Sequence, residues 1–184
     1  MYEVMMAKKR KKLLGKSEIE RSLTRVAHEL TEQLSIEELV LIGIRTRGEF
    51  IATRLSKALM KISGTDVPTG YLDVTFYRDD FRERLIQPQV KGTDISFPLD
   101  GKTVLLTDDV LFTGRTIRAA MNEIMDFGRP ASVALAVLVD RGHREMPIKA
   151  NFVGKNIPTS NMEHVLVRLS EVDDEDAVYL VNYA

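Results

Sequence analysis

The sequence predicts an α/β fold in which a central, mostly parallel sheet is flanked by helices. Short apolar segments with the composition of strands alternate along the chain with amphipathic segments of helical period, which is the pattern of strands joined by crossover helices. Polar or glycine-containing segments follow three of the expected strands, at residues 45–48, 108–116 and 140–144. Because ligands of such folds bind beyond the carboxyl ends of the strands, a functional site is expected there.

The first half of the chain predicts a helix, a buried strand and a second helix. Ser17 and Glu20 have the spacing of a capping box, and apolar residues recur behind them at helical intervals as far as Leu34. Residues 39–44 form a nearly continuous apolar run, which indicates a buried strand. Beyond the turn at residues 45–48, apolar side chains again repeat at helical spacing: Ile51, Leu55, Ala58, Leu59 and Ile62.

The second half adds further strands, a loop and a third helix. Residues 72–77 alternate apolar and polar side chains, as a strand with one solvated face does. Residues 78–100 carry charges and two prolines without periodicity and predict a long loop, and long loops in compact domains are usually functional. A helix is expected from Thr116 to Phe127, with Gly128 as its C-terminal stop. Other strands are expected at residues 104–106, 133–139, 165–169 and 178–181.

The composition excludes several classes of protein. The 184 residues contain no cysteine, which excludes a disulfide framework, a thiolate metal site and a cysteine nucleophile. No apolar run reaches the roughly 18 residues of a membrane helix, and only two leucines follow the basic run at residues 8–12, which is too few for a secretory segment. We expect a cytoplasmic protein without membrane contact, with one domain over residues 17–184 behind a partly disordered basic extension over residues 1–16.

Residues 104–116, with the sequence VLLTDDVLFTGRT, are the most informative segment. A buried strand leads to adjacent carboxylates at Asp108 and Asp109, and a loop with a glycine then opens a helix. The unpaired N–H groups and the dipole of a helix start bind phosphate, and Gly114 allows close approach of the backbone. Two carboxylates would repel a phosphate unless sugar hydroxyls or a cation lay between them, and a ribose meets that requirement.

A simpler interpretation is that Asp108 and Asp109 are a solvated strand end next to an ordinary N-capping threonine. For an isolated pair of aspartates that interpretation would be preferred. The thirteen-residue arrangement as a whole favours a sugar-phosphate site.

This segment resembles the phosphoribosyl pyrophosphate signature of the type I phosphoribosyltransferases, although Thr107 stands where an aliphatic residue is usual. The resemblance implies that Asp108 and Asp109 hold the ribose hydroxyls while the loop surrounds the 5′-phosphate. It also implies that the turn at residues 46–48 binds pyrophosphate, often with a non-proline cis peptide. The ligands of phosphoribosyl pyrophosphate and UMP that it implies are Thr46, Arg47, Gly48, Arg78, Asp108, Asp109, Val110, Leu111, Phe112, Thr113, Gly114, Arg115 and Thr116.

Four further segments narrow the resemblance to one family. From about Glu18 to the C-terminus the chain is similar to the pyrimidine operon attenuator/uracil phosphoribosyltransferase family, the PyrR type. This implies a type I phosphoribosyltransferase fold with a small hood and a flexible active-site loop. The segments that carry the resemblance are residues 22–29 (SLTRVAHE), 77–80 (YRDD), 137–145 (VLVDRGHRE) and 153–160 (VGKNIPTS).

The family resemblance implies a reaction in which uracil N1 attacks C1′ of phosphoribosyl pyrophosphate, giving UMP and pyrophosphate. Mg²⁺ is the implied cofactor, held mainly by substrate and water without direct protein ligands. The loop at residues 78–91 would close over the site and exclude water. Arg141 and Ile157 are expected near the uracil, with a structural ion pair as the alternative role of Arg141. The implied catalytic residues are Asp108, Asp109, Arg47 and Arg78, and Asp109 is the candidate if a general base is needed.

A second implied function is binding of a stem-loop in pyrimidine-leader messenger RNA, strengthened by UMP, so that transcription terminates early. The net charge of −1 gives the whole molecule no strong basic field, so only a local basic face could serve. The alternative to RNA binding is that the basic residues of such a face are solvated surface charges. The family also implies a homo-oligomer, a dimer or larger. The RNA-binding residues implied by the resemblance are Thr24, Arg25, His28, His143, Arg144, Lys149 and Lys155.

Three other functions remain open at this point. The chain could be the enzyme without the RNA role, or a purine phosphoribosyltransferase, because the sequence does not display the base pocket. It could also be an RNA-binding regulator that uses the nucleotide site only as a sensor. A sensor of UMP has no need of pyrophosphate ligands, so Arg47 and Arg78 together with the two aspartates argue against the last of these.

Overall fold

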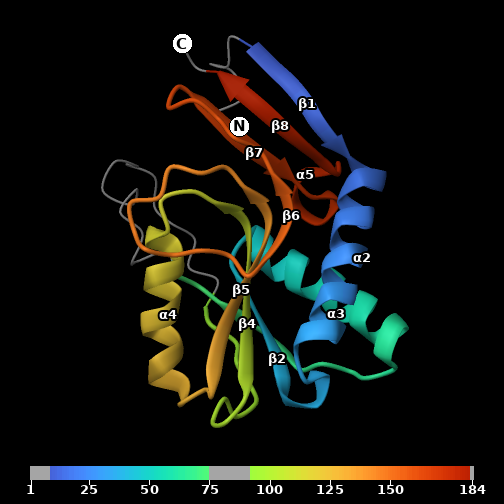
Figure 1. Ribbon diagram of the computed structural model, residues 1–184, viewed down its shortest axis with the longest axis vertical. Coiled ribbons are helices and arrows are strands. Elements are labelled where there is room, and N and C mark those ends of the chain that lie inside the picture. Colours follow the sequence, from blue (N-terminus) through green and yellow to red (C-terminus); the bar gives the residue numbers. More distant parts are fainter. Residues whose placement is uncertain (1–8, 75–91, 183–184) are drawn as a thin grey trace.

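A five-stranded parallel sheet forms the centre of the molecule (Figure 1). The computed structural model describes residues 9–74 and 92–182. Every neighbouring pair of strands in this sheet is parallel, which confirms the predicted α/β fold with a mostly parallel sheet. In spatial order the strands are β3 (Thr69–Leu72), β2 (Leu39–Ile44), β4 (Thr103–Leu111), β5 (Ser132–Asp140) and β6 (Phe152–Asn156).

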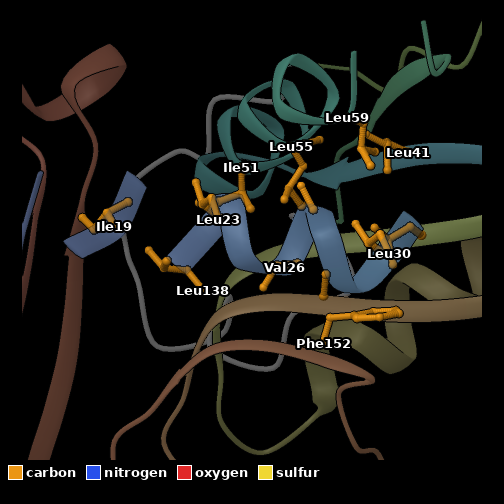
Figure 2. Packing of buried hydrophobic residues seen from close by; sticks show 14 of the residues in the cluster. Ile19, Leu23, Val26, Leu30, Leu41, Ile51, Leu55, Leu59, Leu138 and Phe152 are labelled. Carbon is orange, nitrogen blue, oxygen red and sulfur yellow. The ribbon is translucent and has the colours of Figure 1, made fainter. Parts of the chain in front are cut away.

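Helices cover both faces of the sheet (Figure 1). Helices α2 (Lys16–Gln33) and α3 (Arg47–Ser63) pack on one face, and α4 (Arg115–Phe127) packs on the other. Because successive strand residues point to opposite faces, Leu105 belongs to the first core and Leu106 to the second. Figure 2 shows the first core, where apolar side chains of α2 and α3 meet those of the sheet. A single 3₁₀ turn (Ile36–Glu38) joins α2 to β2.

A second, smaller sheet forms the hood. Its strands are antiparallel in the order β1 (Lys9–Gly15), β8 (Ala177–Asn182) and β7 (Glu163–Arg168), and the short helix α5 (Ser170–Asp173) joins β7 to β8. The hood lies at one end of the central sheet, at the top of Figure 1. The expected hood is therefore present.

The structure corrects the prediction for the start of the chain. Lys9–Gly15, expected to belong to a partly disordered extension over residues 1–16, is strand β1 and pairs with β8. Its four basic residues are all exposed, so the strand shows no apolar alternation that the sequence could reveal. Helix α2 begins at Lys16, and Glu18 rather than Glu20 accepts the capping hydrogen bond, from Gly15 N at 2.9 Å. Residues 1–8 lie outside the described part of the chain.

Other expectations differ in position. Strand β3 precedes the strand predicted at residues 72–77 and shares only Leu72 with it, and residues 73 and 74 are not in a strand. Residues 75–91, which include the whole predicted active-site loop at residues 78–91, lie outside the described residues. Strand β4 continues to Leu111 and so contains both aspartates, which were expected to follow it. Strand β6 and helix α5 were not predicted. None of the helices in residues 9–74 and 92–182 combines the length and apolarity that a bilayer-spanning segment needs.

Candidate active site

A cavity of about 660 Å³ lies between the central sheet and the hood. The turn after β2, the end of β4 with the loop that follows, and strand β7 of the hood all line it. The predicted sugar-phosphate and pyrophosphate segments thus meet at one site. Lining residues to which the sequence analysis assigned no site role are Arg45, Ile117, Glu145, His164, Val165, Leu166 and Val167.

The two aspartates are held by the backbone of their own strand. Asp108 is buried, with 8% of its surface exposed, and its Oδ1 accepts a hydrogen bond from Asp109 N at 2.9 Å. Asp109 is half-buried, and its Oδ1 accepts from Val110 N at 2.8 Å. Among the described residues, no group hydrogen-bonds Oδ2 of Asp109. A carboxylate with one oxygen fixed and the other available can accept from a ribose hydroxyl.

The loop at residues 112–114, here called the phosphate loop, connects β4 to α4. Gly114 precedes the first residue of α4 and has φ of 91°, a conformation in which glycine is strongly favoured. Arg115 N donates to Thr113 Oγ1 at 3.3 Å, and Arg118 N makes the first helical bond to Gly114 O at 3.0 Å. The first residues of this thirteen-residue helix, Arg115 to Ile117, line the cavity, so the helix start lies where the phosphate interpretation places it.

The turn after β2, at residues 45–48, is in direct contact with strand β4. The Arg45–Thr46 peptide is cis. A Cβ on Gly48 would lie 2.4 Å from Thr107 O, so only glycine fits there without a shift of the backbone. Thr107 is fully buried, and its hydroxyl donates to Gly48 O at 2.9 Å. This hydrogen bond explains why a threonine can replace the usual aliphatic residue at this position of the signature.

Arg47 is tied to the hood. Its Nε and Nη2 donate to Oδ2 and Oδ1 of Asp173 at 3.0 and 2.9 Å. Burial alone would raise the pKa of the Asp173 carboxyl, but the hydrogen bonds from Arg47 and from Leu169 N outweigh it and lower that pKa. The predicted pyrophosphate ligand is thus held in place by a charged residue that the sequence analysis did not identify.

The two residues expected near the base have mostly internal partners. Arg141 is 4% exposed, lies 4.0 Å from the ring centre of Phe112, and donates from Nε to Thr159 Oγ1 at 3.1 Å. Burial lowers its pKa. The Ile157 N–H donates to Asp140 O at 2.8 Å, so the Ile157 carbonyl, rather than its N–H, is the backbone group left to hydrogen-bond a base. Arg141 also lines the cavity. Its contacts within the described residues are hydrogen bonds and a ring contact rather than the ion pair that was the alternative, and its place near the base stays a prediction.

The expected RNA-binding residues fall into two groups. Thr24 and His28 are exposed on α2, and Lys155 is exposed on the neighbouring strand β6. Arg25 joins these elements, because its Nη2 donates to the carbonyls of Val153 and Gly154 at 2.9 and 2.7 Å.

The second group follows β5. His143 and Lys149 are exposed, and His143 Nε2 lies 2.6 Å from Thr159 O. Arg144 instead turns toward the phosphate loop and is 22% exposed. Arg78, the remaining predicted site residue, lies outside the described residues, as do all but the last nine residues of the expected loop at residues 78–100.

Comparisons with known proteins agree with this geometry. Residues 10–171 match the family model of the phosphoribosyl transferase domain, and the match begins within β1. A hypoxanthine phosphoribosyltransferase from Staphylococcus aureus superposes with a TM-score of 0.70 over 96% of this chain and 93% of its own, at 22% identity. A second, from Trypanosoma cruzi, gives 0.69 over 94% and 96%, at 20% identity. At such identities these structures show the fold alone.

Much closer relatives decide the family. The chain is 53% identical over 167 residues to the bifunctional protein PyrR of Clostridioides difficile (strain 630), covering 90% of this chain and 94% of the relative. This chain belongs to the PyrR family of phosphoribosyltransferases. The PyrR of Pelotomaculum thermopropionicum is 51% identical over 180 residues, 97% of this chain and 99% of its own length. The family predicted from the sequence motifs is thus confirmed, and with it the class of enzyme.

Proposed function

We propose that this PyrR-family protein transfers a ribosyl phosphate from phosphoribosyl pyrophosphate to uracil, forming UMP and pyrophosphate, and that bound UMP strengthens its binding to RNA from pyrimidine genes. The observation that carries the proposal is the meeting of three features in one cavity. These are the Arg47 turn, the aspartates at the end of β4, and the phosphate loop that opens α4. A phosphate, a ribose and a pyrophosphate leaving group each have a matching protein element.

Each element has a part in the transfer. The N–H groups at the start of α4 bind the 5′-phosphate and fix the sugar. Asp108 and Asp109 accept the ribose hydroxyls, and their charge favours the positive sugar that develops as the leaving group departs. Arg47 faces the same cavity and neutralises charge on the departing pyrophosphate. Strand β7 covers the cavity from the hood side and limits the entry of water.

A magnesium ion fits this site as a partner of the substrate. Within residues 9–74 and 92–182 there is no cluster of three or more histidine, aspartate or glutamate side chains that would hold a metal by themselves. The ion would be held mainly by pyrophosphate and ribose oxygens and by water, while Asp108 and Asp109 act through the ribose hydroxyls rather than as direct metal ligands. When bound, Mg²⁺ supplies charge neutralisation on the pyrophosphate.

The enzymatic proposal is tested by product formation from phosphoribosyl pyrophosphate with uracil, hypoxanthine or guanine. We expect UMP from uracil, and an Asp109→Ala variant should lose activity by at least about a hundredfold, the effect of removing one preorganised stabilising group. Asp126→Ala, a change of an exposed carboxylate near the end of α4, is the matched control and should keep full activity. Activity on a purine alone would refute the uracil assignment.

The regulatory proposal is supported by exposed basic and polar side chains on α2, on β6 and after β5. Lysine and arginine contacts to phosphate add affinity that falls with salt. Filter binding of a pyrimidine-leader stem-loop, with and without UMP, tests it, and weak binding that UMP does not change would contradict it. We also propose a homo-oligomer, which light scattering of the purified protein tests directly; a monomer would refute that part.

A further inference from the structure

The last residue of β5 and the segment that follows it, residues 140–148, contact the outer side of the phosphate loop and are here called the brace. Arg144 Nη1 donates to the carbonyl of Phe112 at 2.7 Å and lies 3.4 Å from that of Leu111. The N–H groups of Glu145 and Met146 both donate to Thr113 O, at 2.9 and 3.0 Å. Three successive carbonyls are therefore held by one segment.

These contacts determine where the amides of the phosphate loop point. In a trans peptide the N–H of one residue is directed opposite to the carbonyl of the residue before it. With the carbonyls of residues 111–113 turned toward the brace, the N–H groups of Phe112, Thr113 and Gly114 are directed away from it, toward the cavity that these residues line. In the described part of the chain, no acceptor binds any of these three N–H groups. They are the donors that a phosphate would use.

Arg144 is itself fixed by the brace. Its Nε donates to Ile148 O at 3.1 Å, its Nη1 to Gly142 O at 3.0 Å, and its Nη2 forms an ion pair with Asp140. A planar guanidinium with five donors suits this set of fixed acceptors better than an ammonium would.

Side-chain packing adds to the polar contacts of the brace. A Cβ on Gly114 would lie 3.1 Å from Met146 Cβ and 3.3 Å from Ile148 Cβ, so the brace packs closely against the loop glycine. Arg115 Nε also donates to Glu145 Oε2 at 2.7 Å. The brace therefore contacts the loop from Leu111 to Arg115.

We propose that Arg144 is a positioning residue of the phosphate loop rather than a direct contact to RNA, and that the brace couples nucleotide binding to RNA binding. This rests on the function proposed above. The brace carries His143 next to Arg144 and is followed by Lys149, and both side chains are exposed. A phosphate that orders the loop orders the brace through the same hydrogen bonds. By linkage, RNA bound at His143 and Lys149 then raises the affinity for UMP by the factor that UMP raises the affinity for RNA.

The test compares Arg144→Gln and Arg144→Lys with Arg118→Gln, an exposed arginine of α4 whose replacement makes the same change of charge. Calorimetry of UMP binding without RNA should show a loss of affinity of at least about tenfold for Arg144→Gln, the scale of a charge-assisted hydrogen bond. Arg144→Lys should recover only part of it, and Arg118→Gln should match the wild type. The KM for phosphoribosyl pyrophosphate should rise in the same order. Unchanged UMP affinity in Arg144→Gln would overturn the proposal.

RNA binding at saturating UMP separates the two roles of Arg144. A positioning residue predicts that saturating UMP restores the RNA affinity of Arg144→Gln and leaves the salt dependence unchanged. A direct phosphate contact predicts a deficit that UMP does not repair, with the slope of log affinity against log salt reduced by about 0.7 to 0.9. The second result would overturn the proposal.

Hydrogen–deuterium exchange of residues 111–116 in the ligand-free protein makes the test independent of the proposed enzyme. Faster exchange in Arg144→Gln than in Arg118→Gln supports the positioning role even if the wild type binds no nucleotide, a result that would refute only the proposed function. Equal exchange in the two variants would overturn the positioning role.

Discussion

Arg47 and Asp173 join the pyrophosphate turn to the hood through two parallel hydrogen bonds, of 3.0 and 2.9 Å. This fork-to-carboxylate geometry fixes the plane of the guanidinium as well as its position. A residue proposed to bind the leaving group is therefore aligned by a helix of the hood, 126 positions away in the sequence. The proposed pyrophosphate contact of Arg47 and the position of the hood therefore involve the same ion pair.

Replacement of Asp173 by asparagine should weaken substrate binding. Asparagine keeps the shape but removes the charge that aligns Arg47, so the KM for phosphoribosyl pyrophosphate should rise by about fivefold, equivalent to roughly 1 kcal/mol. Asp174→Asn, an exposed neighbour with the same change of charge, is the control and should leave the KM unchanged. A lower KM in Asp173→Asn would show instead that Asp173 competes with pyrophosphate for Arg47.

A methyl group on Gly48 should damage the site. The added Cβ would lie 2.4 Å from Thr107 O, so the turn or the strand must move. We expect Gly48→Ala to lower kcat/KM by at least about tenfold, because displacements near 1 Å at a positioned group have large effects. Lys57→Ala, on an exposed position of the same helix, should have no effect on kcat/KM. Steady-state kinetics decide, and wild-type kinetics in Gly48→Ala would contradict the close packing described here.

The Thr107 hydroxyl should contribute to stability more than to catalysis. Thr107→Val keeps the shape but removes the hydroxyl that donates to Gly48 O. The Gly48 carbonyl belongs to α3 and keeps its helical donor, so the free energy of unfolding should fall by about 0.5 to 1.5 kcal/mol, the net contribution of one hydrogen bond. Thr103→Val makes the same replacement on the same strand, where the hydroxyl pairs with Ser132 in an exposed hydrogen bond, and should cost much less. Urea unfolding of the two variants measures the difference. Equal losses would remove the special role of the hydrogen bond between Thr107 and Gly48.

Acid should loosen the hood through its carboxylates. The hydrogen bond from Arg54 lowers the pKa of Glu171, and Arg54 and Ser170 N together outweigh burial and lower that of Asp176. A depressed pKa in the folded state stabilises the protein above the unfolded pKa, near 4, and this stability is lost as the pH falls further.

The measurement is the melting temperature between pH 6 and about pH 3, a window that spans the unfolded carboxylate pKa values. Asp176→Asn should already melt lower at pH 6 and should then lose less stability than the wild type on acidification. A parallel decline in the two proteins would show that this ion pair does not control the acid response.

The central sheet could be predicted because its strands and helices have clear periods. Strands β2 and β5 are apolar along nearly their whole length, and α3 and α4 bury one face each. Strand β1 could not be predicted, because it begins with four basic residues and lies at an edge of the hood, where those four side chains face solvent. Helix α5 has four residues, too few for a helical period.

The segments that form the site could be predicted from the sequence, but the contacts that hold them in place could not. Residues 104–116 could be recognised as a phosphate site because the strand, the loop and the helix start are contiguous in the sequence. The contacts that hold this segment in place are long-range and have no local signal. Asp173 contacts Arg47 from the hood, across a long separation in the sequence. For Arg144, the neighbouring residues in the sequence do not distinguish an arginine that contacts the phosphate loop from one on the surface. Its role becomes visible only when its carbonyl partners are known.

The pairing of β1 with β8 also bears on how the chain is made. Lys9 lies opposite Asn182 and Gly15 opposite Ala177, so the first and last strands of the described chain are neighbours. Contacts of such sequence separation form late in folding. During synthesis the strands of the parallel sheet can pair as they appear, whereas β1 has no partner until β8 has been translated. A chain cut before Ala177 would leave β1 as a bare edge, open to pairing with other nascent chains.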